Sequence, residues 1–151
     1  MKRWLLRGVV AGLVLFGLIQ LVPYGRRHDN PPVTSEPSWD GARTRELAVH
    51  ACYDCHSNET EWPWYSNLAP ASWLLQRDVD EGRAALNFSE WDREQDKAKD
   101  AAETVADDEM PPFRYLPLHP EARLSGPEKQ ALIRGLIRSI GAEPPDEGDD
   151  G

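Results

Sequence analysis

The order of apolar and polar residues divides the chain into an apolar start and a series of amphipathic segments. The apolar run that follows Arg7 continues to Val22 and is interrupted only by Gln20. Counted from Trp4 it has 19 residues, which as a helix would span about 28 Å, close to a bilayer core of about 30 Å. Basic residues precede the run and no small-residue cleavage site follows it. We therefore expect residues 1–24 to form an uncleaved signal-anchor, a transmembrane helix, rather than a cleaved signal peptide.

Four later segments have apolar residues at the spacing of an amphipathic α-helix. These segments are residues 41–51, 70–86, 89–105 and 125–140. The last is the clearest, because Ser125 and Glu128 form a capping box and Gly141 suits the helix end. Gly82 and Gly135 are predicted to be points where backbones approach closely. The pattern thus predicts one small all-α domain over residues 39–141.

The two flanks of this domain lack helical periodicity. Residues 25–38 contain Pro31, Pro32 and Pro37 among polar residues, which predicts an extended Pro-rich linker. Residues 142–151 are mostly acidic residues, proline and glycine, which predicts an acidic disordered tail.

Charge narrows the choice of partners. From His28 onward there are 12 Lys and Arg against 26 Asp and Glu, a net charge of 12 − 26 = −14. Nucleic-acid binding requires a basic surface and is therefore excluded. An acidic carrier that docks on basic patches of a partner protein fits this charge, and so does solubility alone.

The most informative stretch is the pentapeptide from Cys52 to His56, which reads C-x-x-C-H and contains both cysteines of the chain. This is the attachment signature of a c-type haem. On a helical turn, positions i and i+3 share a face, so Cys52 and Cys55 can both form thioethers with one porphyrin. His56 is then placed to be the proximal ligand of the iron.

An aromatic loop follows this motif. Trp62, Trp64 and Tyr65 lie among prolines and polar residues and are costly to expose together. Two interpretations stay open: ordinary core aromatics, or a lid over the haem edge whose indole N–H or hydroxyl reaches a propionate.

Met110 is the candidate for the sixth iron ligand. It is the only methionine after the initiator, and Pro111 and Pro112 follow it and stiffen the loop. A thioether held on a stiff loop suits the distal side of a His/Met haem. A core-filling methionine is the alternative role, and His119 is the rival ligand.

Several further motifs accompany these residues and resemble the bacterial haem-binding domain family of cytochrome-c-like proteins. The resemblance rests on Cys52-Tyr53-Asp54-Cys55-His56-Ser57-Asn58, Thr60, Trp62-Pro63-Trp64-Tyr65, Ala69-Pro70, Gly82-Arg83, Leu86-Asn87-Phe88-Ser89-Glu90-Trp91, Met110-Pro111-Pro112, Tyr115 and His119. It implies a small cytochrome c-type helical fold with one covalent haem c, with His56 as proximal ligand and Met110 as distal ligand. A Trp late in the last helix, which the family pattern includes, is missing here.

We therefore expect a monohaem c-type cytochrome that passes single electrons to an unidentified redox partner. It would be tethered to the bacterial inner membrane by its single-pass helix, with its domain in the periplasm. No enzymatic activity and no small-molecule substrate are expected. A haem-based sensor with an open or labile sixth site is the main alternative. A C-x-x-C thiol oxidoreductase lacks the βαβ pattern that usually accompanies it, and a zinc site lacks a second ligand pair at finger-like spacing.

Overall fold

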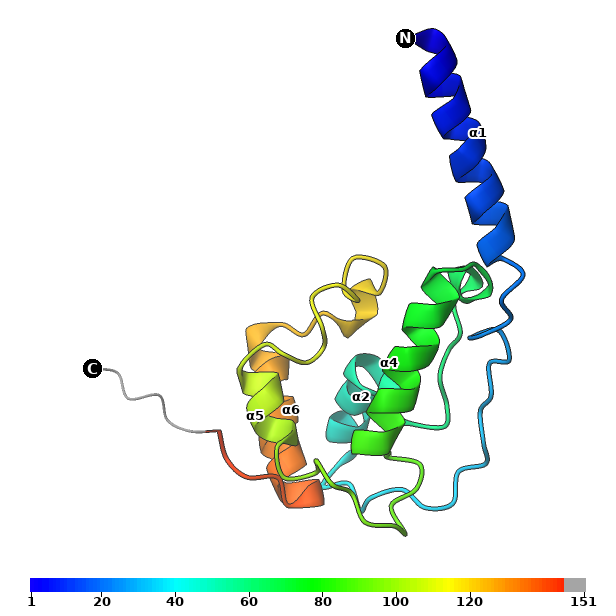
Figure 1. Cartoon of the computed structure of the whole chain (residues 1–151). Helices are drawn as coiled ribbons and strands as arrows, with labels where there is room; N and C mark the ends of the chain where they lie inside the picture. Colours follow the sequence, from blue (N-terminus) through cyan, green and yellow to red (C-terminus); the bar gives the residue numbers. More distant parts are fainter. Residues whose placement is uncertain (146–151) are drawn as a thin grey trace.

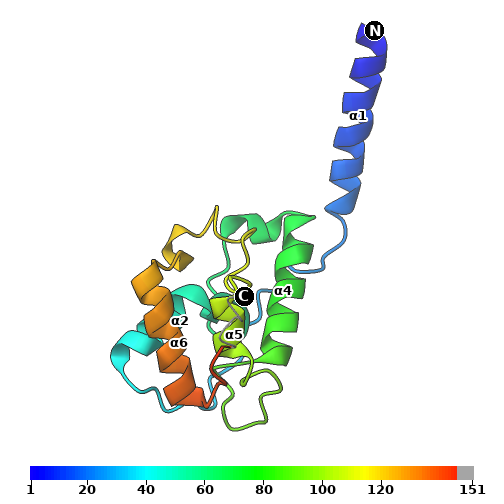
Figure 2. The ribbon, with the colours of Figure 1, turned by 90° about the vertical axis from the view of Figure 1, so that its left-hand side faces the viewer.

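The computed structural model describes residues 1–145, and these residues form an all-α architecture (Figures 1 and 2). The helices are α1 (Lys2–Ile19), α2 (Ala42–Ala51), α3 (Tyr53–His56), α4 (Ala71–Ala85), α5 (Ala101–Ala106) and α6 (Gly126–Ile140), with 3₁₀ turns η1 (Trp64–Asn67) and η2 (Pro120–Ala122). Within these residues the only β pairing is an isolated parallel bridge between Ser35 and Glu90. The all-α prediction is confirmed. Of the predicted acidic tail, residues 146–151 lie outside the described residues.

Helix α1 extends away from the rest of the chain in both views, and none of its residues is buried. The prediction of a transmembrane helix in residues 1–24 was wrong, since none of the helices in residues 1–145 combines the length and apolarity that a membrane crossing needs. The helix ends at Ile19, so Leu21 and Val22 of the apolar run lie outside it. Because it begins at Lys2 and includes Arg7, charged residues occupy part of its 18-residue length.

Helices α2 and α6 cross closely, as the small residue at position 135 predicts. A Cβ on Gly135 would lie 2.8 Å from the Cβ of Thr44 on α2, so glycine permits this contact. The capping box of Ser125 and Glu128 is present at the start of α6, and Gly141 ends the helix with a φ of 68°. The predicted α6 is confirmed at both ends.

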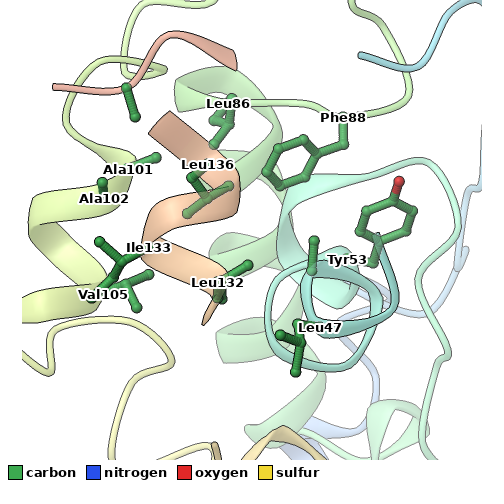
Figure 3. Packing of buried hydrophobic residues seen from close by; sticks show 12 residues of the cluster. Leu47, Tyr53, Leu86, Phe88, Ala101, Ala102, Val105, Leu132, Ile133 and Leu136 are labelled. Atoms are coloured by element: carbon green, nitrogen blue, oxygen red, sulfur yellow. The ribbon is translucent and has the colours of Figure 1, made fainter. Parts of the chain in front are cut away.

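The hydrophobic core lies between α2, α5 and α6 (Figure 3). Leu47 of α2, Val105 of α5 and Leu132 of α6 are each at most 3% exposed. Phe88 closes one end of this core by stacking on Tyr53, with ring centroids 5.6 Å apart. Helix α4 packs instead on α3 and η1.

The predicted helix over residues 89–105 is wrong in its first two thirds. Only Ala101–Ala106 form α5, and the preceding residues form turns. Side chains hold these turns: the Gln95 amide donates to the Glu90 carbonyl oxygen at 2.7 Å, and its oxygen accepts from the Asn87 backbone N–H at 2.8 Å. Such side chain to backbone bonds compete with helix formation.

Residues 20–38, which we call the strap, run along the domain and hydrogen-bond to it. The side-chain amide of Gln20 makes two bonds with the backbone of Ala69, at 2.9 and 3.0 Å. The Arg83 guanidinium donates to the carbonyl oxygen of Asp29 and to the side chain of Asn30. The Thr34 backbone N–H donates to the Ser89 carbonyl oxygen at 2.9 Å. The strap is extended, and these bonds fix it to the domain along its length.

Candidate functional site

The C-x-x-C-H motif forms a tight turn at the end of α2. Cys52 caps α2, and its carbonyl oxygen accepts from the backbone N–H groups of Cys55 and His56 at 3.2 and 2.9 Å. This single helical turn is what lets the two cysteines and the histidine serve one cofactor, as the i, i+3 spacing predicts.

Helix α4 passes directly over this turn at Gly82. A Cβ on Gly82 would lie 2.9 Å from the carbonyl carbon of Cys55, so only glycine allows α4 to come so near. The predicted close approach at Gly82 is confirmed, and its partner is the C-x-x-C-H turn from Cys52 to His56.

The close approach fixes the His56 ring. Its Nδ1 lies 3.0 Å from the carbonyl oxygens of both Gly82 and Leu86. Carbonyl oxygens can only accept, so Nδ1 carries the hydrogen and Nε2 carries the lone pair. Among the described residues Nε2 makes no hydrogen bond, and burial lowers the pKa of His56, which keeps the ring neutral. A neutral imidazole with a free Nε2 is what a metal requires of a histidine ligand.

Two adjoining cavities open beside this turn. The smaller lies between α3, α4 and the loop that carries Met110, and the larger lies between the end of α4 and the α5–α6 pair. Their volumes are about 210 and about 460 Å³, within or near the range of ligand pockets. Both cavities are lined by Ala51, Cys52, His56, Ala85 and Met110. Cys55 lines the smaller cavity only.

Met110 thus shares both cavities with His56. Its backbone N–H donates to the carbonyl oxygen of Thr104 at 3.1 Å, which joins the start of its loop to the end of α5. Pro111 and Pro112 line the smaller cavity beside it. The structure therefore brings together the four residues that the sequence assigned to attachment and iron ligation.

The two cysteines are free thiols of intermediate exposure. Burial raises the pKa of Cys52 to about 12 and that of Cys55 to about 12. Both side chains are therefore neutral thiols at neutral pH. In residues 1–145 no group of three or more His, Cys, Asp or Glu side chains could hold a metal ion, so the zinc interpretation finds no ligand set there.

The aromatic loop lies outside the two cavities. Trp62, Trp64 and Tyr65 line neither of the two cavities. Trp62 stacks on His28 of the strap at 4.8 Å, and Trp64 is 76% exposed. Of the three aromatic residues, Trp62 therefore packs on the strap, where its indole N–H also donates to the side-chain oxygen of Asn30 at 3.1 Å.

His119, the rival ligand, is also outside both cavities. Its side chain is buried, with Nε2 2.7 Å from the hydroxyl of Tyr65 and Nδ1 3.1 Å from a carboxylate oxygen of Glu121. Both ring nitrogens are therefore engaged. This arrangement favours Met110 over His119 as the residue available to the iron.

Sequence reasoning missed two residues of the cavity wall. Asp54 and Tyr115 both line the smaller cavity, and the Tyr115 hydroxyl donates to the Asp54 carboxylate. Burial and this neighbouring carboxylate raise the pKa of Tyr115, so the hydroxyl keeps its proton. No local spacing signal joins residues 61 positions apart.

Comparison with known protein families agrees with this geometry. The family model described as a haem-binding domain matches residues 14–137, which is most of the chain. The chain belongs to this haem-binding domain family, as the sequence motifs indicated. The matched range includes the strap and the last part of α1. No curated protein and no solved structure matches the chain.

Haem is thus the cofactor of this domain, and the residues of the site fit it. Two thiols, a neutral imidazole with a free nitrogen and a thioether all border the same adjoining cavities. The walls otherwise include apolar side chains such as Leu86, Val105 and Leu136, which suit a large apolar ring.

Proposed function

We propose that this protein is a monohaem c-type cytochrome that carries single electrons. The observation that carries the proposal is that Cys52, His56 and Met110 line both cavities together. In this assignment the Cys52 and Cys55 thiols would each add S–H across a vinyl group of the haem to give two thioethers, and His56 and Met110 would hold the iron.

Each residue has a defined task. When bound, the haem iron supplies one-electron chemistry by alternating between its ferric and ferrous states. Nε2 of His56 is oriented by the two backbone carbonyl groups that hold Nδ1, a bond that also raises the ligand's basicity. The Met110 thioether would raise the reduction potential.

The proposal includes a location and a partner. Covalent attachment of c-type haem occurs outside the cytoplasmic membrane in bacteria, so we infer that the domain works in that compartment. The net charge of −14 from residue 28 onward supports a redox partner that presents a basic surface. In this role the protein is a carrier without a substrate of its own.

The raised pKa values of the cysteines argue against a thiol oxidoreductase. That chemistry requires a thiolate nucleophile, and catalytic C-x-x-C cysteines have lowered pKa values. Burial raises the pKa of Cys52 and of Cys55 instead.

The test is a pyridine haemochrome spectrum of the full chain, matured by a periplasmic haem-attachment system, together with the spectrum of the oxidised protein. We expect a c-type haemochrome and the weak long-wavelength band of Met-ligated ferric haem. A c-type haemochrome without that band would indicate an open or labile sixth site and support a sensor. Absence of covalent haem would overturn the proposal.

A further inference from the structure

Asp54, one of the two residues between the cysteines, connects the C-x-x-C-H turn to the loop that carries Met110. Asp54 occupies the second x of C-x-x-C-H, on α3. One of its carboxylate oxygens accepts the hydroxyl hydrogen of Tyr115, and the other accepts the backbone N–H of Glu61 at 2.8 Å. Tyr115 lies five residues after Met110, and both line the smaller cavity. The bond therefore spans from the proximal attachment turn to the distal loop.

The Tyr115 ring is held in place by His119. Its ring stacks on the imidazole of His119 with centroids 3.8 Å apart and an interplanar angle of 8°. With Nδ1 donating to Glu121, the His119 Nε2 accepts from the Tyr65 hydroxyl at 2.7 Å. Tyr65 belongs to η1, which packs on α4. The side chains of His119 and Tyr65 therefore join the loop to the part of the domain formed by η1 and α4.

The tie between this loop and α4 is weaker. Arg114 pairs with Asp78 of α4 at 2.9 Å, but the Arg114 side chain is 64% exposed, and such pairs contribute little. The bond from Tyr115 to Asp54 is part-buried and its acceptor is a carboxylate group, which makes it one of the stronger kinds of hydrogen bond.

We propose that the Asp54–Tyr115 hydrogen bond is a latch that closes the Met110 loop over the haem and keeps the Met110 thioether on the iron. The inference rests on the proposed function, since it requires haem with Met110 as sixth ligand. Tyr115 and Asp54 are positioning residues: they act through the loop and are not ligands. When the latch opens, the sixth site becomes accessible to an external ligand, so the strength of this bond sets how labile the site is.

The variant that tests the latch is Tyr115→Phe, because it removes one hydroxyl and retains the ring that stacks on His119. The matched control is Tyr24→Phe, which also removes a tyrosine hydroxyl near a carboxylate, 3.4 Å from Asp80, but lines neither cavity. Both are prepared as the full chain with haem attached. Carbon monoxide is the probe of the sixth site in the ferrous form.

We expect Tyr115→Phe to retain covalent haem, to raise the affinity for carbon monoxide about tenfold, and to weaken the Met-ligation band of the ferric form. Amide hydrogen exchange at Met110 and Tyr115, whose N–H groups bond to Thr104 and Pro112, should speed up, while exchange in α6 stays unchanged. The Tyr24→Phe control should match the wild type in all of these.

The outcomes separate the two proposals. A wild-type protein without covalent, Met-ligated haem overturns the proposed function and this inference with it. A wild-type protein with Met-ligated haem, and a Tyr115→Phe variant with unchanged affinity, band and loop exchange, overturns the latch alone. Equal changes in Tyr115→Phe and Tyr24→Phe would also overturn it, since the effect would then not be specific to this bond.

Discussion

The carbonyl oxygen of Gly82 accepts a hydrogen bond from Nδ1 of His56 at 3.0 Å, at the point where α4 contacts the C-x-x-C-H turn. A glycine without a side chain is what permits both the contact and the bond. The orientation of His56, the proposed proximal ligand, therefore depends on a residue 26 positions away in the sequence.

The variant Gly82→Ala tests this dependence. The added methyl group meets the backbone of Cys55, and backbone cannot move aside as a flexible side chain can. We expect the free energy of unfolding to fall by about 1–3 kcal/mol, although alanine favours a helix by about 1 kcal/mol. Denaturant unfolding measures this free energy, and the yield of covalent haem should fall in parallel.

Gly126→Ala is the control, since a Cβ there meets nothing within 4 Å. A Gly82→Ala variant as stable as the wild type would contradict the prediction.

Replacing Met110 with alanine tests the distal ligand. Loss of the thioether should lower the reduction potential, on the order of 0.1 V within the roughly 0.8 V range that axial ligands span. The Met-ligation band should disappear, and ferrous haem should bind carbon monoxide. Spectroelectrochemical titration and a carbon monoxide difference spectrum are the measurements.

His119→Gln is the companion variant, because His119 is the rival ligand and lies outside both cavities. We expect it to keep the Met-ligation band. If instead His119→Gln lost the sixth ligand and Met110→Ala kept the wild-type potential, the ligand assignment would have to be exchanged.

Removing the two thiols tests attachment. In the double variant Cys52→Ala with Cys55→Ala, no thioether can form, so haem should be lost when the protein is denatured. Each single variant should keep one bond. Mass spectrometry of the denatured protein distinguishes these states, and haem that stays covalently bound to the double variant would refute the assignment.

The pair of Glu36 and Arg45 should make stability depend on pH. Two hydrogen bonds of 2.6 and 2.7 Å join their side chains, and they hold the pKa of Glu36 below its usual value. The Glu36 contribution is therefore complete above the unfolded value of about 4.3 and is lost as the pH falls through the lower folded value. Glu36→Gln should cost about 1 kcal/mol at pH 7, where denaturant unfolding measures it, and progressively less in acid.

Glu46→Gln is the matched control for this experiment. Glu46 also pairs with an arginine, Arg43, at 2.9 Å, but both side chains are more than half exposed. Its loss should change the unfolding free energy by less than about 0.5 kcal/mol. A Glu36→Gln effect that is the same at pH 3 and pH 7 would contradict the linkage.

The sequence predicts a helix well where start signal, apolar stripe and end signal all lie within the same segment. Helix α6 has a capping box, an apolar stripe and a terminal glycine, and all three appear in the structure. The segment from Trp91 to Asp100 also has helical spacing, yet it forms turns, because the Gln95 side chain bonds to the backbone groups of Asn87 and Glu90. Local periodicity does not register such competing bonds.

The site residues also divide into those that a local motif predicts and those that only the fold brings together. The thiols and His56 follow from one short motif, and Met110 follows from a single methionine before two prolines. Asp54 and Tyr115 could not be paired in advance, because only the folded chain brings them together. The contact between Trp62 and His28 could not be predicted, because His28 belongs to the segment interpreted as an extended linker.

The strap has a consequence for where an independently folding unit begins. Periodicity places that start near Trp39, but Gln20, Asp29, Asn30 and Thr34 all bond to the domain upstream of it. A protein shortened to residue 39 would leave Arg83 without the two strap partners that accept its outer N–H groups. The boundary of this domain is therefore set by polar bonds of an irregular segment, and a truncation guided by hydrophobicity would remove part of its scaffold.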